Sequence, residues 1–148
     1  MQLIFTKGAG KFDQMAVIRE DGPSERVECP KQGIIPHDMV HYAVESVLRK
    51  RGFVTRLAAG ETLDYRMGPE PESDGVERLV EVFQADAWAG WSSAPADMLD
   101  LYRVTCRARR CEALAVDEQD VEAVRDCILA LTARWQATGV GQSVALAF

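Results

Sequence analysis

The sequence predicts an α+β domain in which a small antiparallel sheet packs against three to four helices. Short segments of alternating apolar residues occur near the start of the chain and again at its end, and helical periodicities fill the region between them. Strands are thus segregated from helices, which favours α+β over α/β. The length of 148 residues, with 47% hydrophobic and 27% charged, fits a single domain spanning residues 1–148.

The first part of the chain predicts a meander of three short strands. Apolar residues alternate over 3–5 and over 15–17, and the Gly-Ala-Gly-Lys segment at 8–11 is a turn signal between them. A second turn at 21–24 precedes a third predicted strand at 25–29. Short strands joined by such turns pair with their neighbours in antiparallel fashion.

A helix is predicted to begin at Pro36, with Asp38 in its first turn, and to run to about Arg51 before Gly52. The following segment, 53–59, fits either a short helix or an extended piece.

The remaining elements are predicted from composition and periodicity. Residues 61–74 hold prolines, a glycine and several acids, and we expect an exposed, mobile loop. Helices are then expected over 75–90, from about 95 to 110, and over 117–139, where Asp117 is the expected N-cap. The alternation over 142–148 predicts a last strand, which should join the N-terminal meander because a lone strand leaves its backbone groups unpaired.

Charge and hydropathy exclude several classes of function. The formal net charge of −6 argues against a nucleic-acid surface and against a polybasic membrane anchor. The N-terminal segment lacks the pattern of a signal peptide, and no apolar run approaches the ~20 residues that span a bilayer. We therefore expect a soluble, cytoplasmic protein without nucleic-acid or membrane partners, for which a protein partner or a homo-oligomer remains open.

The four cysteines, Cys29, Cys106, Cys111 and Cys127, contain no Cys-x-x-Cys pair. Without an export signal, reduced thiols are expected.

The only compact cluster of chemically capable residues lies in the predicted helix, at 36–45. His37 and His41 are the only histidines of the chain and lie four residues apart, and Glu45 follows after another four. At about 100° per residue the two histidines project ~40° apart. We expect both imidazoles at the rim of the core and Glu45 further toward solvent. The buried face of the helix is expected at Val40, Val44, Val47 and Leu48.

Two histidines at this spacing can offer two nitrogens to one metal ion, for which zinc is the candidate. Either His37 with His41 or His41 with Glu45 is a reasonable ligand pair, whereas all three would strain reach over ~12 Å. The third ligand would come from Cys29, Cys106, Cys111 or the acids of 61–74. In this hypothesis the protein is a metal-dependent hydrolase, and Glu45 or Asp38 orients or deprotonates the metal-bound water.

Other interpretations of this cluster stay open. Asp38 stands where the metalloprotease pattern has Glu, and at a helix start it also answers the helix dipole. The histidines can be purely structural, or can form a metal-free polar site. A nucleophile pair of Cys29 and His37 is a further hypothesis, because a neighbouring imidazolium lowers a thiol pKa.

Two surface features suggest the competing class, a non-enzymatic binding or assembly module. Trp88 and Trp91 can form a partner surface, although the spacing of Trp91 favours the core. A row of arginines can bind an anion or RNA, or form a solvated face in which Asp100 pairs with Arg103. The row consists of Arg103, Arg107 and Arg110, with Arg109 nearby.

The chain resembles a family of short, uncharacterised bacterial proteins. The resemblance is carried by the Pro-His-Asp-x-x-His-x-x-x-Glu pattern at 36–45, by Gly52-Phe53, and by Trp135 followed by Gly141 and an alternating strand. It implies a bacterial source and one domain, and brings no activity. The sequence therefore indicates where a site would lie without assigning its reaction.

Overall fold

A computed structural model describes residues 1–63 and 68–148, and its four strands form one antiparallel sheet. The strands are β1 (Gln2–Thr6), β2 (Phe12–Ile18), β3 (Glu25–Pro30) and β4 (Ser143–Ala147), in the order β3-β2-β1-β4. The N-terminal meander is thus present, and β4 pairs with β1 in the register Phe5↔Val144. This confirms the predicted α+β class and the expectation that the last strand joins the N-terminal meander.

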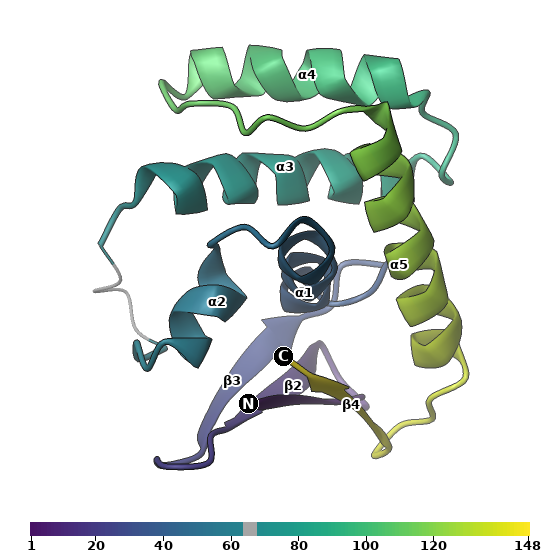
Figure 1. Ribbon diagram of the computed structural model, residues 1–148. Helices are drawn as coiled ribbons and strands as arrows, with labels where there is room; N and C mark the ends of the chain where they lie inside the picture. Colours follow the sequence, from purple (N-terminus) through teal and green to yellow (C-terminus); the bar gives the residue numbers. More distant parts are fainter. Residues whose placement is uncertain (64–67) are drawn as a thin grey trace.

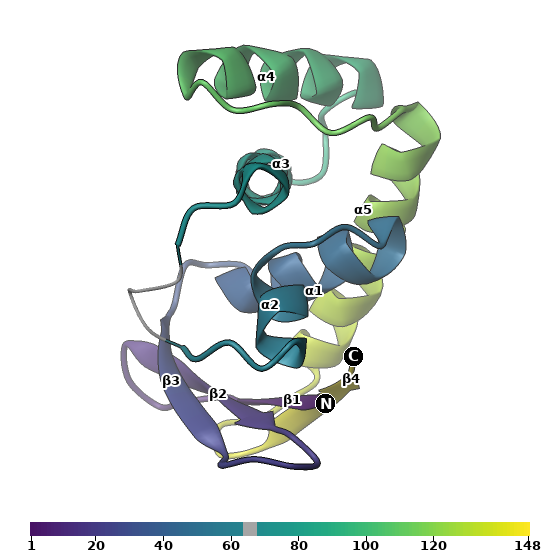
Figure 2. The same cartoon turned by 60° about the vertical axis from the view of Figure 1, so that its left-hand side comes forward.

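Five helices among the described residues cover one face of the sheet. They are α1 (His37–Leu48), α2 (Phe53–Ala58), α3 (Pro71–Trp88), α4 (Pro95–Ala108) and α5 (Glu118–Gln136). Figures 1 and 2 show α1 and α2 lying over the sheet, α3 above α1, and α4 above α3, while α5 runs along the side of this stack. The short α2 settles the ambiguous segment 53–59 in favour of the helical alternative.

The position of α1 between the sheet and α3 decides how the candidate residues are buried. The inward side chains of β1 and β2 are fully buried, as are Met39, Val40 and Val44 on α1. Because α3 packs on the opposite side of α1, the face that carries His41 and Glu45 is covered as well. A helix enclosed on two sides places polar groups in the interior, where each needs a partner.

Two helix boundaries differ from the prediction for steric reasons. The first helix ends at Leu48 instead of about Arg51, because Arg49 adopts the left-handed conformation with φ 53° and ends the hydrogen-bond ladder. Gly52 is instead the N-cap of α2. A Cβ at Gly52 would lie 2.6 Å from Cγ1 of Val76 and 2.7 Å from Cδ of Glu45, so only glycine fits this approach.

The expected loop at 61–74 is wrong for its last four residues, since α3 begins at Pro71. Proline suits the first turn of a helix because its missing N–H has no intrahelical partner there. Residues 64–67 of that predicted loop lie outside the described residues.

The start of α5 follows the prediction. Asp117 accepts a hydrogen bond from the amide of Asp120, and the Asp120 side chain accepts one from the Asp117 amide. None of the helices in the described ranges has the length and apolar character needed to cross a membrane. The four cysteines are free thiols.

Candidate metal centre

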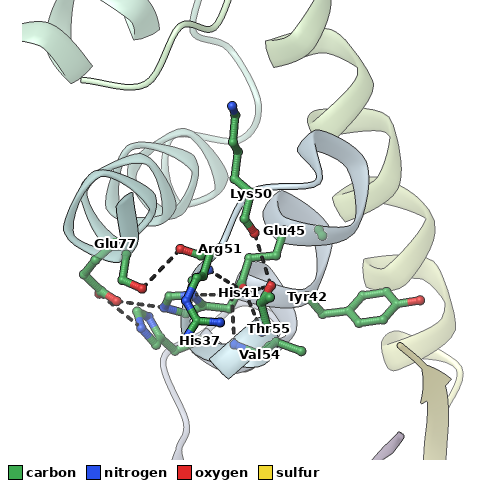
Figure 3. A network of polar contacts seen from close by, with 12 residues as sticks. His37, His41, Tyr42, Glu45, Lys50, Arg51, Val54, Thr55 and Glu77 are labelled. Atoms are coloured by element: carbon green, nitrogen blue, oxygen red, sulfur yellow. Dashed lines mark hydrogen bonds and ion pairs between the residues drawn. The ribbon is translucent and has the colours of Figure 1, made fainter. Parts of the chain in front are cut away.

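The site lies where α1 and α3 cross and is built by three side chains. His37 is the first residue of α1, His41 lies one turn further along, and Glu77 reaches them from α3 (Figure 3). The Nε2 atom of His37 is 3.3 Å from Oε1 of Glu77, and Nε2 of His41 is 2.8 Å from Oε2 of the same carboxylate. One ligand atom from each of the three residues lies within 4.8 Å of the others.

His41 is the buried member of the site, with 2% of its surface exposed. Its Nδ1 atom lies 3.1 Å from Oε2 of Glu45, while Nε2 faces Glu77. Ionised carboxylates only accept hydrogen bonds, so both contacts form together when the ring is an imidazolium. Burial alone would lower the pKa of His41, but hydrogen bonds and charge from Glu45 and Glu77 outweigh it and raise the pKa to about 9.

Glu77 is bound by both histidines and remains partly exposed. Burial favours its neutral form, yet the hydrogen bonds from His37 and His41 and their charge hold the pKa of this carboxyl well below its usual range. The carboxylate is thus ionised at neutral pH, which is the state that a metal ligand needs.

Glu45 is fully buried and is held by the N-terminal end of α2. Its Oε1 accepts from the amides of Gly52 and Thr55 at 3.0 and 2.8 Å and from the Thr55 hydroxyl at 2.8 Å. Its Oε2 accepts from the amide of Val54 at 3.1 Å in addition to His41. No residue of α2 caps these amides with its own side chain, so Glu45 satisfies donors that a helix start would otherwise leave unpaired.

The structure confirms part of the geometry that the sequence predicts. His37 and His41 share one side of α1, their rings stand edge to face with centroids 4.8 Å apart, and a polar group from another segment reaches both. The expectation for Glu45 was wrong. This residue is buried and not closer to solvent. It contacts Nδ1 of His41, the ring nitrogen opposite the one that faces Glu77, and it stays outside the group of three.

The prediction for the third ligand is wrong, because the third member of the group is Glu77, which is neither a cysteine nor an acid of 61–74. It follows Val76 and precedes the apolar Leu79 and Val80 on α3, so it borders the buried face of that helix. An acid at this border was the available signal. Its pairing with the histidines depends on the way α3 crosses α1. The periodicity of a single helix does not define that crossing.

Asp38, the other acid considered, lies in the first turn of α1 and outside the group of three among the described residues. Burial raises the pKa of its carboxyl, although the charges of His41 and His37 act in the opposite direction.

The Cys29 nucleophile hypothesis gains no support from the structure. Cys29 is buried on β3, and burial, followed by the charges of Asp38 and Asp13, raises the pKa of its thiol to about 12. A thiol activated by an imidazolium would show the opposite shift.

The three donors suit a divalent transition metal. Two imidazole nitrogens and one carboxylate oxygen form the donor set of catalytic zinc sites and of non-haem iron sites. Donor atoms around a tetrahedral zinc ion lie about 3.3 Å apart, which is close to the His37–Glu77 distance of 3.3 Å. Because the side chains of His37 and Glu77 are 40% and 34% exposed, the side of the site away from His41 is open to water.

The surface features take separate roles. Trp88 is 57% exposed and donates from Nε1 to the Gln32 carbonyl at 2.7 Å, whereas Trp91 packs partly against the core. The Arg103–Asp100 pair is present at 3.5 Å on the exposed side of α4.

Comparison with known proteins finds no match to this chain among family models, curated proteins or solved structures. The family resemblance carried by the 36–45 pattern therefore stays a prediction. The geometry of the site is the basis on which a function is assigned.

Proposed function

We propose that this protein binds a divalent transition-metal ion, with zinc as the leading candidate, through His37, His41 and Glu77, and uses it to activate water for hydrolysis. The observation that carries the proposal is the convergence of both histidines of the chain on one carboxylate from another helix. Three protein ligands with an open fourth side are typical of catalytic zinc, whereas structural zinc has four protein ligands.

The contact between His41 and Glu45 supports this assignment. Histidine ligands of metals usually donate their second ring N–H to a carboxylate or carbonyl, which directs the other nitrogen at the ion. Glu45 occupies that position at Nδ1, so Nε2 is the nitrogen presented to an ion. In the absence of metal, a proton on Nε2 bridges to Glu77, and a metal ion would replace this proton.

The residues have distinct roles in the proposed reaction. His37, His41 and Glu77 would hold the ion, which supplies a Lewis acid and lowers the pKa of a bound water. Glu45 acts through His41 and is a positioning residue. Asp38, which follows His37 in the first turn of α1, is the candidate for proton transfer.

Metal binding is tested on protein made without a histidine tag. Metal content is measured after purification, and Zn²⁺ and Co²⁺ affinities are then measured by calorimetry and by the visible spectrum of bound Co²⁺. Glu77→Gln should weaken binding by more than about 100-fold, since losing even an indirect partner of a ligand costs 10–100-fold. Glu72→Gln, an exposed acid in the first turn of α3, is the matched control and should bind as wild type does.

Histidine NMR adds an independent readout because the chain has only two imidazole rings. Added Zn²⁺ should shift the Nε2 resonances of both rings and leave a proton on Nδ1 of His41. If both rings keep their metal-free resonances at saturating Zn²⁺, the pair is a structural ion network and the proposal is wrong.

Hydrolysis is tested with p-nitrophenyl acetate and p-nitrophenyl phosphate as generic ester substrates. Turnover should require added metal and should disappear in Glu77→Gln while Glu72→Gln retains it. Stoichiometric metal binding without turnover of either ester, or of further ester and amide substrates, would limit the protein to metal binding and would contradict the hydrolytic part.

A further inference from the structure

A second site candidate lies where the end of α4 turns back over α3. A cavity of about 190 Å³ is lined there by Asp74 and Arg78 of α3 and by Arg109, Arg110 and Cys111, which follow α4. It shares no lining residue with the metal centre and faces α4, whereas Glu77 faces α1.

The backbone at the end of α4 explains why the arginines gather. Arg110 adopts a left-handed conformation with φ 54°, and the amide of Cys111 donates to the Cys106 carbonyl at 3.0 Å. This is the hydrogen bond of a helix that ends by reversing its chain direction. The Tyr102 hydroxyl, which donates to the Gly75 carbonyl at 2.8 Å, ties α4 to α3, so the reversal brings Arg109 and Arg110 toward Arg78.

Arg78 is the member of this group whose hydrogen bonding is incomplete. Its side chain is only 13% exposed, and Nη2 lies 3.1 Å from Oε1 of Glu81. Its Nε is buried and has no hydrogen-bond partner within 1–63 and 68–148. A buried donor without an acceptor is costly, more so when it is charged. The guanidinium of Arg78 therefore lacks part of its acceptor set among the described residues.

The charge and size of the cavity indicate which acceptor fits. Three arginines and one aspartate, Asp74, line the cavity, and one of the arginines, Arg78, also pairs with Glu81, in a protein whose net charge is −6. Guanidinium groups match phosphate and carboxylate oxygens with paired hydrogen bonds. The volume is below the roughly 300–1,000 Å³ of pockets that enclose drug-sized ligands. A small tetrahedral oxyanion has the negative charge, the paired acceptor oxygens and the size that this cavity requires.

We propose that Arg78, Arg109 and Arg110 form a binding site for a phosphate-type oxyanion, either free phosphate or the phosphoryl group of a small ligand. The arginine row of the sequence thus divides into two parts. Arg103 and Arg107 lie on the solvent side of α4, and Arg103 pairs with Asp100. Arg109 and Arg110 lie past the end of the helix and line the same cavity as Arg78 of α3.

Binding is measured by calorimetry and by ³¹P NMR, with chelator present so that metal ions do not contribute. Inorganic phosphate and phenyl phosphate are titrated at constant ionic strength, with chloride as the reference. Wild-type protein should bind one equivalent of at least one phosphate probe in preference to chloride. If phenyl phosphate binds more tightly than phosphate, the ligand is a phosphoryl group, and equal affinities indicate the free ion.

Three variants separate a built site from a general charge effect. Arg109→Ala/Arg110→Ala removes two surface charges and should weaken phosphate binding by about tenfold or more. Arg103→Ala/Arg107→Ala removes the same charge from the neighbouring exposed side of α4 and should leave affinity unchanged. His41→Ala should also bind phosphate as wild type does, so this test is independent of the metal centre. Equal weakening by both double variants, or no preference over chloride, would overturn the proposal.

Discussion

Replacing Glu45 by Gln tests the most constrained feature of the site. The carboxylate accepts five hydrogen bonds in an interior from which water is excluded, and the amide has the same shape with one acceptor oxygen instead of two. If the carbonyl oxygen of the glutamine replaces Oε1, the donors from Gly52 and Thr55 keep their acceptor. The NH₂ group then faces the amide of Val54 and Nδ1 of His41.

The magnitude follows from those two lost contacts. Leaving the Val54 amide unpaired costs about 1–3 kcal/mol. Breaking one side of a buried ion pair costs about 3–5 kcal/mol, which the new amide partly recovers by donating to a neutral His41. We therefore expect Glu45→Gln to lose about 2–5 kcal/mol, from a total stability of about 5–15 kcal/mol. Because donation to Nδ1 moves the His41 proton to Nε2, metal affinity should also fall about 10–100-fold.

Urea unfolding of the chelated protein measures the stability, and calorimetry with Zn²⁺ measures the affinity. Thr55→Val is the matched control, since it removes one hydrogen bond to Glu45 and leaves the carboxylate in place. It should cost about 1 kcal/mol and leave the tautomer of His41 and the metal affinity unchanged. A Glu45→Gln protein with wild-type stability and affinity would refute the role assigned to Glu45.

Three further outcomes are expected. Gly52→Ala should destabilise the fold by about 1–3 kcal/mol in thermal melts and perturb Glu45, because its Cβ would lie 2.7 Å from Cδ of that residue; an unchanged melting temperature would contradict the close approach. Tyr102→Phe should cost about 1–3 kcal/mol in urea unfolding, since its hydroxyl donates to one backbone carbonyl and accepts from one amide, and a neutral effect would mean that water replaces both contacts. In chelated protein, the raised pKa of His41 adds stability that is complete below pH 6.5 and is lost as pH rises through about 9. The lowered pKa of Glu77 adds stability that is present above pH 4.5 and is lost as pH falls below that value. Stability should therefore be greatest between pH 4.5 and 6.5, and a His41→Ala protein that keeps the alkaline loss would place its origin elsewhere.

Local sequence patterns were sufficient to predict those features of the fold that depend on the residues of a single helix or strand. The capping pair of Asp117 and Asp120 starts α5, and the alternation ending at Phe148 forms an edge strand whose partner could be expected from the need to pair backbone groups. The four-residue spacing of His37 and His41 likewise requires the side chains to share one face of any helix that contains them.

The environment of those side chains needed the packing of α1 against its neighbours. Periodicity places Glu45 about 80° from His37 on an isolated helix, which suggested solvent, but α2 folds back and covers that side with its amides. The same packing explains Gly52, which reads as a helix stop in the sequence and serves in the structure as a place where three segments meet closely.

The sequence by itself determined the α+β class, the single helix that carries the chemical residues, and the two histidines as a pair, because these depend on contacts within a few residues. Only the tertiary structure decided that Glu77 completes the group, that Glu45 contacts the far nitrogen of His41, and that Arg109 and Arg110 line one cavity with Arg78. Each of these involves a second element whose crossing angle and depth are set by how the buried side chains of both elements interdigitate. A one-dimensional pattern records which face of a helix is apolar, but not which residue of another helix lies opposite it.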